Sequence, residues 1–523
     1  MRSRALLTMV LLSTAVVSGG WLVRRGLVGG RSTLANKRLF DEVYRHVSNE
    51  FVDTLSDSAL DRRAADGLVQ ELNDPHSAYL SADVLRTFDE RTSGHYAGVG
   101  ARIDVRNGRI TIVSTLPGGP ALDAGVQPGD QVTAVDGRPV VALKLEEARK
   151  LLRGAPGSVV RLTIERAGVA APLDIALTRR DIRVHSVQHA MLLRPGLGYV
   201  ALAVFSEESA SELRRAVDSL TAQGPLSLIL DLRGDPGGLL EQGVGVSELF
   251  LDPGQRIVSM RGRLPAASES FDDRLPQPWP RLPLTILVDS NTASAAEIVA
   301  GALQDHDRAL IVGAPTYGKG SAQSIFKLNN GAAVKLTTAL WFTPSGRTID
   351  RKRGSDGSAV PDVDSVRTRR ARYVTDAGRS VLGGGGITPD VILPADRISP
   401  GDTAFERSLG TTFPQFRDAL TEYALQLKAS GTIASPAFAV TPAMRAELLR
   451  RMQARGISTD RATFERAATL IDRVIGYEVA RYVFGEPAEY ARRLHDDAAL
   501  ARTISIVSGA TTQRELLARA TKR

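Results

Sequence analysis

Apolar residues recur with a helical period near both ends of the chain and with a strand period between them. The pattern predicts mainly helical structure over residues 36–92, with a break at Asp74-Pro75, and helical structure again beyond Pro400. The first apolar stripe consists of Phe40, Val43, Val47 and Phe51. The last stripe is expected to line one face of a helix in a packed helical domain or dimer surface, and it consists of Phe464, Ala468, Ile471, Ile475 and Val479.

After the first helical region, short strands and turns replace the helical pattern. Asn107-Gly108 stands between two apolar runs and predicts a two-residue hairpin, and Asp136-Gly137 marks a second turn. Leu145–Arg153 is predicted to be a short amphipathic helix that Gly154 ends in the left-handed conformation. These elements predict a β-rich domain with one main helix over residues 94–182.

Nearly continuous apolar runs then alternate with helical sequence. Residues 225–231 and 282–289 have the pattern of strands buried on both faces, and each run ends in an Asp followed by a loop. This order is typical of βαβ units, in which ligands bind at the carboxyl ends of the strands. We therefore expect an α/β core over residues 183–398, with a polar surface insertion at 350–379, and a helical domain over residues 399–523.

The composition excludes several kinds of site. The 523 residues include no Cys, which excludes disulfides, thiolate nucleophiles, iron–sulfur clusters and zinc sites of the Cys type. The net charge of +8 is modest for this length, and no block of basic residues is interleaved with aromatics, so nucleic-acid binding is not expected. Only nine of the 66 basic residues are Lys, so a Lys inside a motif is informative here.

The N-terminus predicts the compartment. Basic residues at positions 2 and 4 precede an apolar run over residues 5–23, which is long enough to cross a bilayer. Residues 1–30 are therefore predicted to be a signal-anchor or a cleaved signal peptide, with the anchor favoured, and residues 31–93 an N-terminal helical region. The rest of the chain is expected in the periplasm or at the outer face of the cytoplasmic membrane.

Ser294 lies where a predicted strand gives way to a predicted helix. Serine is favoured as a helix N-cap, which is one interpretation of this position. The other is a nucleophile, because the unpaired N–H groups of the first helical turn would face a developing oxyanion. His306, the one His nearby in sequence, lies past the far end of the same helix and is expected to be an ordinary helix-end residue.

Lys319 stands between two glycines in a loop that nearly matches a phosphate-binding motif. Gly320 takes the place of the Ser or Thr that the motif requires, which argues against nucleotide binding. The flanking glycines instead allow close packing around the lysine, and a desolvated lysine amine has a lowered pKa and can act as a general base. Gln323 is placed to orient that amine, and the glycines at the end of the loop 231–238 can turn N–H groups towards an anion.

Together these motifs resemble the carboxyl-terminal processing proteases, the PDZ-containing S41 family of serine peptidases. The resemblance covers about residues 36–395 and is carried by Asp231–Gly238, Thr292–Glu297, Thr316–Gln323, Gly386–Val391 and Asn73–Tyr79. It implies a multidomain α/β protein with an N-terminal helical segment, a PDZ domain, a protease core like those of ClpP and crotonase, and a C-terminal helical domain.

The resemblance also implies roles for individual residues. Ser294 would be the nucleophile, Lys319 the general base and Gln323 the residue that orients the lysine. The oxyanion hole would use the backbone N–H groups of Ala295 and of Gly237 or Gly238. The family's pattern is altered at Thr292 and Ala296, which bears on specificity rather than on activity. No metal or organic cofactor is implied.

In the PDZ domain, the resemblance implies a loop that receives the terminal carboxylate of a peptide, while the peptide adds as a strand beside it. This loop consists of Gly98, Val99, Gly100 and Ala101. Arg153 matches a family position that links the PDZ domain to the protease, although it would equally compensate the dipole of its helix.

The function implied is that of an envelope serine endopeptidase that binds protein C-termini and cleaves near them. Its expected partners are proteins with accessible, apolar C-termini, an envelope adaptor protein, the membrane and a second copy of the chain. The alternative is a non-catalytic PDZ adaptor that only binds C-terminal tails. A lipid- or retinoid-binding relative of the same fold is disfavoured by the PDZ unit.

Overall fold

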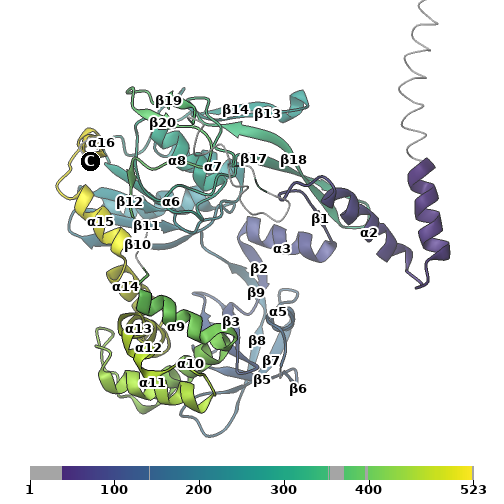
Figure 1. Cartoon of the computed structure of the whole chain (residues 1–523), viewed down its shortest axis with the longest axis vertical. Coiled ribbons are helices and arrows are strands. Elements are labelled where there is room, and N and C mark those ends of the chain that lie inside the picture. Colours follow the sequence, from purple (N-terminus) through teal and green to yellow (C-terminus); the bar gives the residue numbers. More distant parts are fainter. Residues whose placement is uncertain (1–37, 141, 352, 354–369, 395–397, 521–523) are drawn as a thin grey trace, which may run out of the picture. The chain divides into compact units, whose positions relative to one another are not determined.

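The computed structural model describes residues 38–140, 142–351, 353, 370–394 and 398–520 (Figure 1). They separate into two compact units. Of the described residues, 38–82 and 325–336 form the first unit, and the others form the second. No helix of the described part is long and apolar enough to cross a membrane. The predicted anchor at residues 5–23 lies outside the described residues, as does the rest of segment 1–30.

Residues 38–82 of the first unit are mainly helical, as predicted, and contain one short strand. A helix covers residues 38–50 and carries the first three residues of the first apolar stripe, and Phe51 follows directly after its end. All four side chains of this stripe are exposed. It is followed by α2 (Asp57–Gln70), which Ser56 caps by accepting the N–H of Ala59. The strand β1 (Ala78–Leu80) pairs with the first residues of β18 (Ala333–Phe342). Three residues are too few to show a strand period, so the sequence did not predict β1.

The second unit begins with the predicted β-rich domain. One sheet has the strand order β3-β4-β5-β7-β8, with β6 paired to β5, and a separate pair joins β2 to β9. Asn107 and Gly108 have φ of 50° and 70°, which confirms the two-residue hairpin between β3 and β4. The elements are α3 (Ala82–Ser93), β2 (His95–Gly98), β3 (Ala101–Arg106), β4 (Arg109–Thr115), α4 (Pro120–Asp123), β5 (Gln131–Val135), β6 (Arg138–Pro139), α5 (Leu145–Leu152), β7 (Val159–Glu165), β8 (Leu173–Thr178) and β9 (Arg180–Arg183).

The end of α5 differs from the prediction. Gly154 is not among the residues with positive φ, so the predicted left-handed cap is wrong. The chain instead turns extended at Arg153, which forms a β-bridge with Gly98 of β2. A β-carbon at position 154 would lie 3.0 Å from the side chain of Arg179, which would have to shift to accommodate it. Pairing with β2, which lies far away in sequence, therefore overrides the local helix-ending signal.

The core of the second unit has three layers (Figure 1). Its sheet has the order β10-β11-β12-β15-β16-β21, with all neighbours parallel except β10 and β11. Helices α6–α8 share one buried cluster with the sheet, and α15 and α16 share another. The two predicted buried strands are confirmed as β12 and β15. The elements are β10 (Val187–Arg194), β11 (Leu197–Leu202), α6 (Ser209–Thr221), β12 (Ser227–Asp231), α7 (Leu240–Glu248), β15 (Leu284–Val288), α8 (Ala295–Asp305), β16 (Leu310–Gly313) and β21 (Val391–Ile392).

A second sheet contains β18 and β13 (Arg256–Gly262), with β14 (Glu269–Asp272) beside β13 and β17 (Ser321–Lys327) beside β18. A short 3₁₀ helix, Pro265–Ala267, joins β13 to β14. In the predicted insertion 350–379, the strand β19 (Arg372–Val374) pairs with β20 (Ser380–Leu382), which follows directly after the insertion. Most of the insertion lies outside the described residues.

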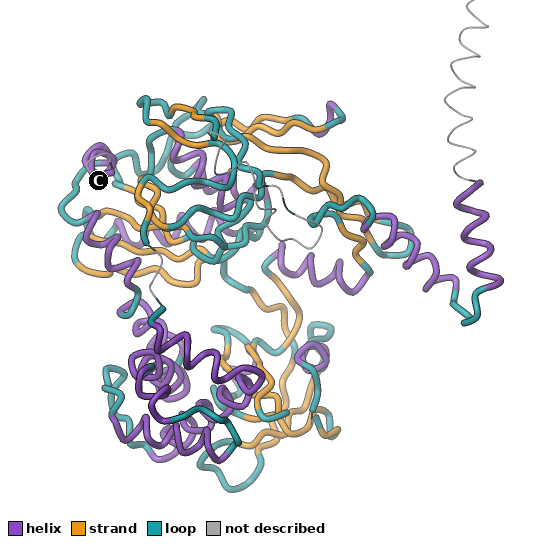
Figure 2. Tube along the Cα trace, in the orientation of Figure 1, coloured by secondary structure: helices purple, strands orange, loops and turns teal. Residues whose placement is uncertain are grey.

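The chain beyond residue 399 is helical, as predicted (Figure 2). Its last apolar stripe does not lie on one helix, however, because the chain turns at Ala467. Phe464 belongs to α12, whereas Ile471, Ile475 and Val479 belong to α13, and all four are buried in one core. The helices are α9 (Pro400–Leu409), a 3₁₀ turn (Gly410–Thr412), α10 (Phe413–Ser430), α11 (Pro442–Ala454), α12 (Arg461–Arg466), α13 (Ala468–Phe484), α14 (Glu486–His495), α15 (Ala498–Val507) and α16 (Gln513–Ala520).

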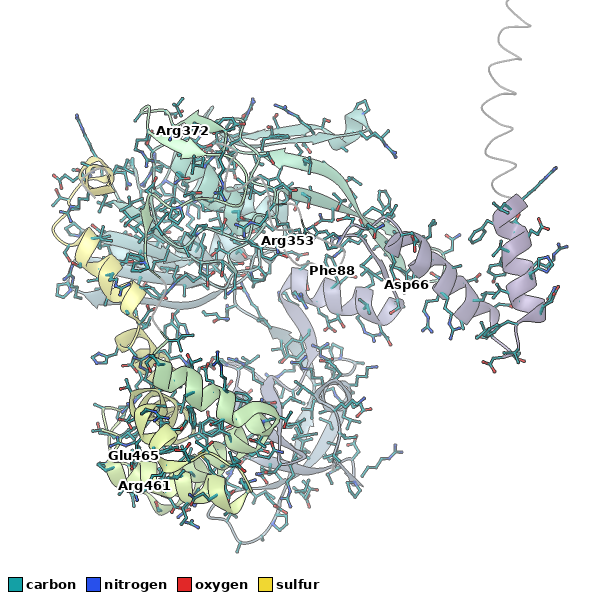
Figure 3. The ribbon with its side chains drawn as sticks, in the orientation of Figure 1. Asp66, Phe88, Arg353, Arg372, Arg461 and Glu465 are labelled. Carbon is teal, nitrogen blue, oxygen red and sulfur yellow. The ribbon has the colours of Figure 1, made fainter. Side chains whose placement is uncertain are left out.

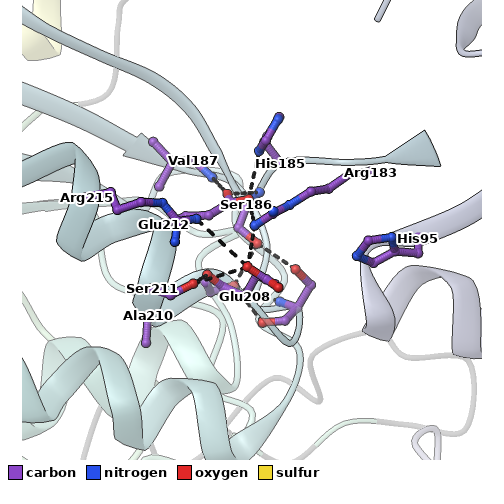
Figure 4. A network of polar contacts seen from close by, with 12 residues as sticks. His95, Arg183, His185, Ser186, Val187, Glu208, Ala210, Ser211, Glu212 and Arg215 are labelled. Carbon is purple, nitrogen blue, oxygen red and sulfur yellow. Dashed lines mark hydrogen bonds and ion pairs between the residues drawn. The ribbon is translucent and has the colours of Figure 1, made fainter. Parts of the chain in front are cut away.

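The segment between β9 and β10 is held by the carboxylate of Glu212 in α6 (Figure 4). Glu212 accepts hydrogen bonds from the N–H groups of Ser186 and Val187 and contacts His185 Nδ1 at 2.8 Å. Burial by itself raises the pKa of Glu212, but these N–H groups and the His185 ring outweigh it and lower the pKa below its ordinary value. The ionised carboxylate therefore fixes the connection between the β-rich domain and the core.

Candidate active site

Ser294 lies at the junction between β15 and α8, where it is the N-cap of the helix. Its backbone has φ 55° and ψ −118°, a conformation that non-glycine residues adopt only when their surroundings enforce it. Gly237 packs directly against this junction, since a β-carbon on it would lie 2.8 Å from Ser294 Cβ. Only glycine at position 237 allows the loop 231–238 to approach the serine this closely.

The buried carboxylate of Glu297, in the first turn of α8, joins the serine to the lysine loop. Its Oε2 accepts the N–H of Ser294 and the N–H of Lys319, each at 2.9 Å. Its Oε1 accepts the N–H of Gly318 at 2.7 Å and the hydroxyl of Thr316. Burial raises the pKa of Glu297, and these four donors act in the opposite direction. One carboxylate thus fixes the backbone of both predicted catalytic residues.

Lys319 lies in the loop between β16 and β17, held at both of its backbone groups. Besides the bond to Glu297, its carbonyl accepts the indole N–H of Trp341 at 3.1 Å. β-Carbons on Gly318 and Gly320 would each lie 2.9 Å from neighbouring atoms, so the expected close packing around the lysine is confirmed. Gln323, on β17, donates its amide to the hydroxyls of Ser321 and Thr337 at 3.0 and 3.2 Å.

The loop 231–238 brings its glycines to the same place. The N–H of Gly237 donates to Asp235 Oδ1 at 2.7 Å, so this group is already engaged. Asp235 is fully buried, and its burial raises its pKa well above the ordinary value. Ala295 is the first residue of α8, so its N–H has no acceptor within the helix. Of the two glycines that the sequence offered for the oxyanion hole, the geometry therefore favours Gly238 beside Ala295.

A buried network ties this loop to the C-terminal helices. Arg233 binds Asp231 and also Asp497, the N-cap of α15, each at 2.6 Å. The hydroxyl of Tyr199 on β11 donates to Asp231 at 2.8 Å and contacts the hydroxyl of Tyr490 on α14 at the same distance. Burial and the nearby Asp231 carboxylate raise the pKa of Tyr199 far above its ordinary value. The start of the loop is therefore bonded to β11 and to the N-cap of α15.

The predicted carboxylate-binding loop, residues 98–101, connects β2 to β3. The carbonyls of Val99 and Gly100 accept the N–H groups of Ala121 and Leu116, inside the β-rich domain. Because a trans peptide points its C=O and N–H in opposite directions, the N–H groups of Gly100 and Ala101 face away from that interior. Arg153, at the end of α5, forms an ion pair with Glu90 of α3.

A cavity of about 950 Å³ lies beside this loop. Val99, Ala101 and Ile103 line it on one side, and α5 contributes Leu145, Arg149 and Leu152. The cavity is also lined by residues of α14, among them Glu486 and Tyr490. It is large enough for several residues of an extended peptide.

Two family profiles and several known proteins match this chain. The profile of Peptidase family S41 matches residues 196–365, and a PDZ domain profile matches residues 111–166. A carboxy-terminal-processing protease of Bartonella bacilliformis is 38% identical over 314 residues, which cover 59% of this chain and 71% of the relative. The carboxy-terminal processing protease CtpA of Bacillus subtilis is 34% identical over 359 residues, which cover 67% of this chain and 76% of the relative.

The chain belongs to the carboxy-terminal processing proteases of peptidase family S41. Among solved structures, the photosystem II D1 C-terminal processing protease is 28% identical, covers 69% of this chain and 94% of its own, and has a TM-score of 0.37. The expected fold, a PDZ domain with an S41 core and a C-terminal helical region, is confirmed. The protein is a serine-type endopeptidase, so the alternative of a non-catalytic adaptor is set aside.

His306 has the position expected for a helix-end residue of this protease. It is the C-cap of α8, at the opposite end from Ser294, and its ring contacts Asp376 and the carbonyl of Arg256, each at 2.7 Å. In the described part of the chain, no group of three or more His, Cys, Asp or Glu side chains is arranged to hold a metal ion.

Several residues of this protease's site escaped the sequence analysis. The family resemblance marks Thr292 only as an altered position near the predicted nucleophile. Its buried hydroxyl donates to the carbonyl of Leu232 at 2.8 Å and so joins two loops. Glu297 lies in a recognised motif, and its spacing of three residues from an N-cap serine is the signal that could have identified it. Tyr490 and Asp497 carried no signal, because nothing in the sequence brings α14 and α15 to the loop 231–238.

Proposed function

We propose that this protease cleaves proteins near their C-termini with Ser294 as the nucleophile and Lys319 as the general base. The observation that carries the proposal is the single Glu297 oxygen that accepts the N–H groups of both residues. A buried carboxylate that accepts hydrogen bonds from both backbones keeps the distance between them fixed. Catalysis by a nucleophile and a base depends on such positioning.

In the proposed reaction, neutral Lys319 accepts the proton of the Ser294 hydroxyl as its oxygen attacks the scissile carbonyl. The N–H groups of Ala295 and Gly238 stabilise the resulting oxyanion. Lys319 then protonates the leaving amine, which departs as the C–N bond breaks. A water molecule, deprotonated by the same lysine, then attacks the acyl carbonyl. The ester bond to Ser294 Oγ breaks, the lysine returns the proton to the serine oxygen and the peptide leaves with a new C-terminal carboxyl group.

Gln323 is proposed to orient the lysine. Its amide nitrogen is committed to the hydroxyls of Ser321 and Thr337, which leaves the amide oxygen as the group that can accept a hydrogen bond from the lysine amine. An acceptor fixed in this way favours one position of a flexible lysine side chain.

Substrate capture is proposed to occur in the PDZ domain. The N–H groups around Gly100 and Ala101 would bind the terminal carboxylate, and the cavity between β3 and α5 would take an apolar tail. Arg153 lies at this loop through its bridge to Gly98 and its pairing with Glu90 in α3. We expect Arg153 to respond when a peptide binds in this cavity.

The protease is also proposed to act in the cell envelope, anchored by residues 5–23. The basic and apolar pattern of the N-terminus supports this location. Added protease should digest the chain in spheroplasts with an intact cytoplasmic membrane. Protection of the chain until the membrane is lysed would contradict the location. An adaptor protein and a second copy of the chain remain proposed partners.

Covalent labelling tests the catalytic proposal. A serine-directed phosphonylating reagent should modify Ser294 in the full-length chain, as located by mass spectrometry of its peptides. Labelling should fall at least about 100-fold in Lys319→Ala, because the hydroxyl then lacks its base. Ser290→Ala changes an exposed serine of the same loop and should label normally. Substrate cleavage retained by Ser294→Ala would refute the mechanism.

A further inference from the structure

One edge of β3 is not paired with any described strand. The length of this edge determines how many residues of a substrate tail can pair with the PDZ domain as an added strand. The strand stands at the end of its sheet and pairs only with β4 among the described strands. Under the proposed function, on which this inference rests, a tail with its carboxylate at the loop 98–101 runs along β3 from Ala101 towards Arg106.

The hairpin determines which residues of β3 face that edge. Arg106 and Arg109 flank a two-residue turn and so form a hydrogen-bonded pair with each other. Backbone groups alternate along a strand, so those of Val105, Ile103 and Ala101 point outward to the free edge. Three residues of β3 could in principle pair with a tail.

Both outward groups of Val105 are already occupied. Its N–H donates to Asp104 Oδ1 at 2.8 Å, and its carbonyl accepts Arg417 of α10 at 3.3 Å. Arg417 also forms an ion pair with Asp104 at 3.3 Å. A side chain from the C-terminal helices therefore covers the last pairing position of β3.

Other contacts hold the C-terminal helices against the PDZ domain here. The Lys428 amine donates to the carbonyl of Pro128 at 2.8 Å, and a β-carbon on Gly129 would lie only 2.2 Å from Leu425 Cδ2. Nearer the carboxylate loop, Arg102 on β3 pairs with Glu486 of α14 at 2.6 Å. The position of Arg417 beside β3 is thus supported by packing and by charge.

We infer that the C-terminal helical domain closes the far end of the tail-binding groove and limits strand pairing to about the last four residues of a substrate. Backbone hydrogen bonds between paired strands recur at every second residue, so each outward residue of β3 accounts for two residues of the tail. Ala101 and Ile103 together therefore pair with roughly four tail residues. Residues further upstream in the tail must leave β3 before Val105 and pass α14.

Binding of tails of increasing length tests this inference. The full-length Ser294→Ala chain, which cannot cleave under the proposed mechanism, is titrated with fluorescent peptides of three to eight residues that share one apolar C-terminus. Affinity should rise up to about four residues and then change less than about 2-fold. With Arg417→Ala added, the six- and eight-residue tails should bind about 3- to 10-fold tighter than the four-residue tail, because the carbonyl of Val105 can then accept an N–H group of the tail.

Two variants serve as controls. Arg417→Lys retains a cation that can donate to Val105 and should keep the plateau at four residues. Arg461→Ala removes an arginine that is 82% exposed and pairs with Glu465 of the same helix, α12 (Figure 3), and it should leave the affinity for every tail length unchanged. If Arg417→Ala does not fold, the dependence of affinity on tail length in the chain that retains Arg417 still tests the inference, because that affinity should stop rising at about four residues.

The outcomes separate this inference from the proposed function. An eight-residue tail that binds the Arg417-containing chain at least about 5-fold tighter than a four-residue tail overturns the inference, while tail capture stands. Peptides with an amidated C-terminus are compared in parallel. Equal binding of amidated and free tails, or no binding of either, overturns both the tail capture and the inference built on it.

Discussion

Replacing Lys319 with alanine is expected to lower kcat by about 10³-fold or more, with little change in thermal stability. The loss follows from removing the general base, whose contribution to proton transfer and to activation of the nucleophile is of this order. The fold should persist because Glu297 and Trp341 bind the backbone N–H and carbonyl of residue 319, which alanine retains. Hydrolysis of an unfolded protein substrate and the melting temperature are the measurements.

The same chemistry predicts a pH dependence in the unmodified protease. Only a neutral amine accepts the serine proton, so kcat should rise with pH and fall towards acidic pH as the lysine is protonated. Lys327→Ala, which removes an exposed lysine of β17, is the matched control and should retain full activity. A flat profile from about pH 5 to 9, or an active Lys319→Ala chain, would exclude the lysine as the base.

Replacing Glu297 with glutamine is expected to lower kcat by about 10- to 100-fold while KM changes little. The amide keeps the size of the side chain but has one acceptor oxygen where the carboxylate has two, so some of the four donors lose their partner. Small displacements of a nucleophile and its base have effects of this size. Rates of substrate cleavage and of serine labelling both report the change.

Glu297→Ala should be more severe and mainly a stability effect. Several buried donors would be left unpaired, at a cost of about 1–3 kcal/mol each, so chemical denaturation should show a loss of roughly 3 kcal/mol or more. Glu241→Gln changes an exposed glutamate in the first turn of α7 and should alter neither activity nor stability. Unchanged kcat and stability in both Glu297 variants would show that the carboxylate does not position the site.

Local patterns predicted the elements whose signals lie within a few residues. The Asn107-Gly108 turn, the buried strands β12 and β15 and the position of Ser294 at a helix start all follow from spacing and from turn or cap chemistry. Predictions were wrong where a distant segment competes with a local signal. Gly154 does not form a left-handed cap because β2 pairs with the end of α5.

The same distinction between local signals and contacts with distant segments applies to the candidate active site. The local motifs of the sequence marked Ser294, Lys319 and Gln323 as candidates, and the resemblance of these motifs to a known family implied their roles. Only the tertiary structure decided what holds them in place: Glu297 between two loops, Asp497 of α15 on Arg233, and Arg417 of α10 at the end of β3. These contacts join segments up to several hundred residues apart. A linear pattern does not contain such contacts, since burial and packing, not sequence spacing, bring their partners together.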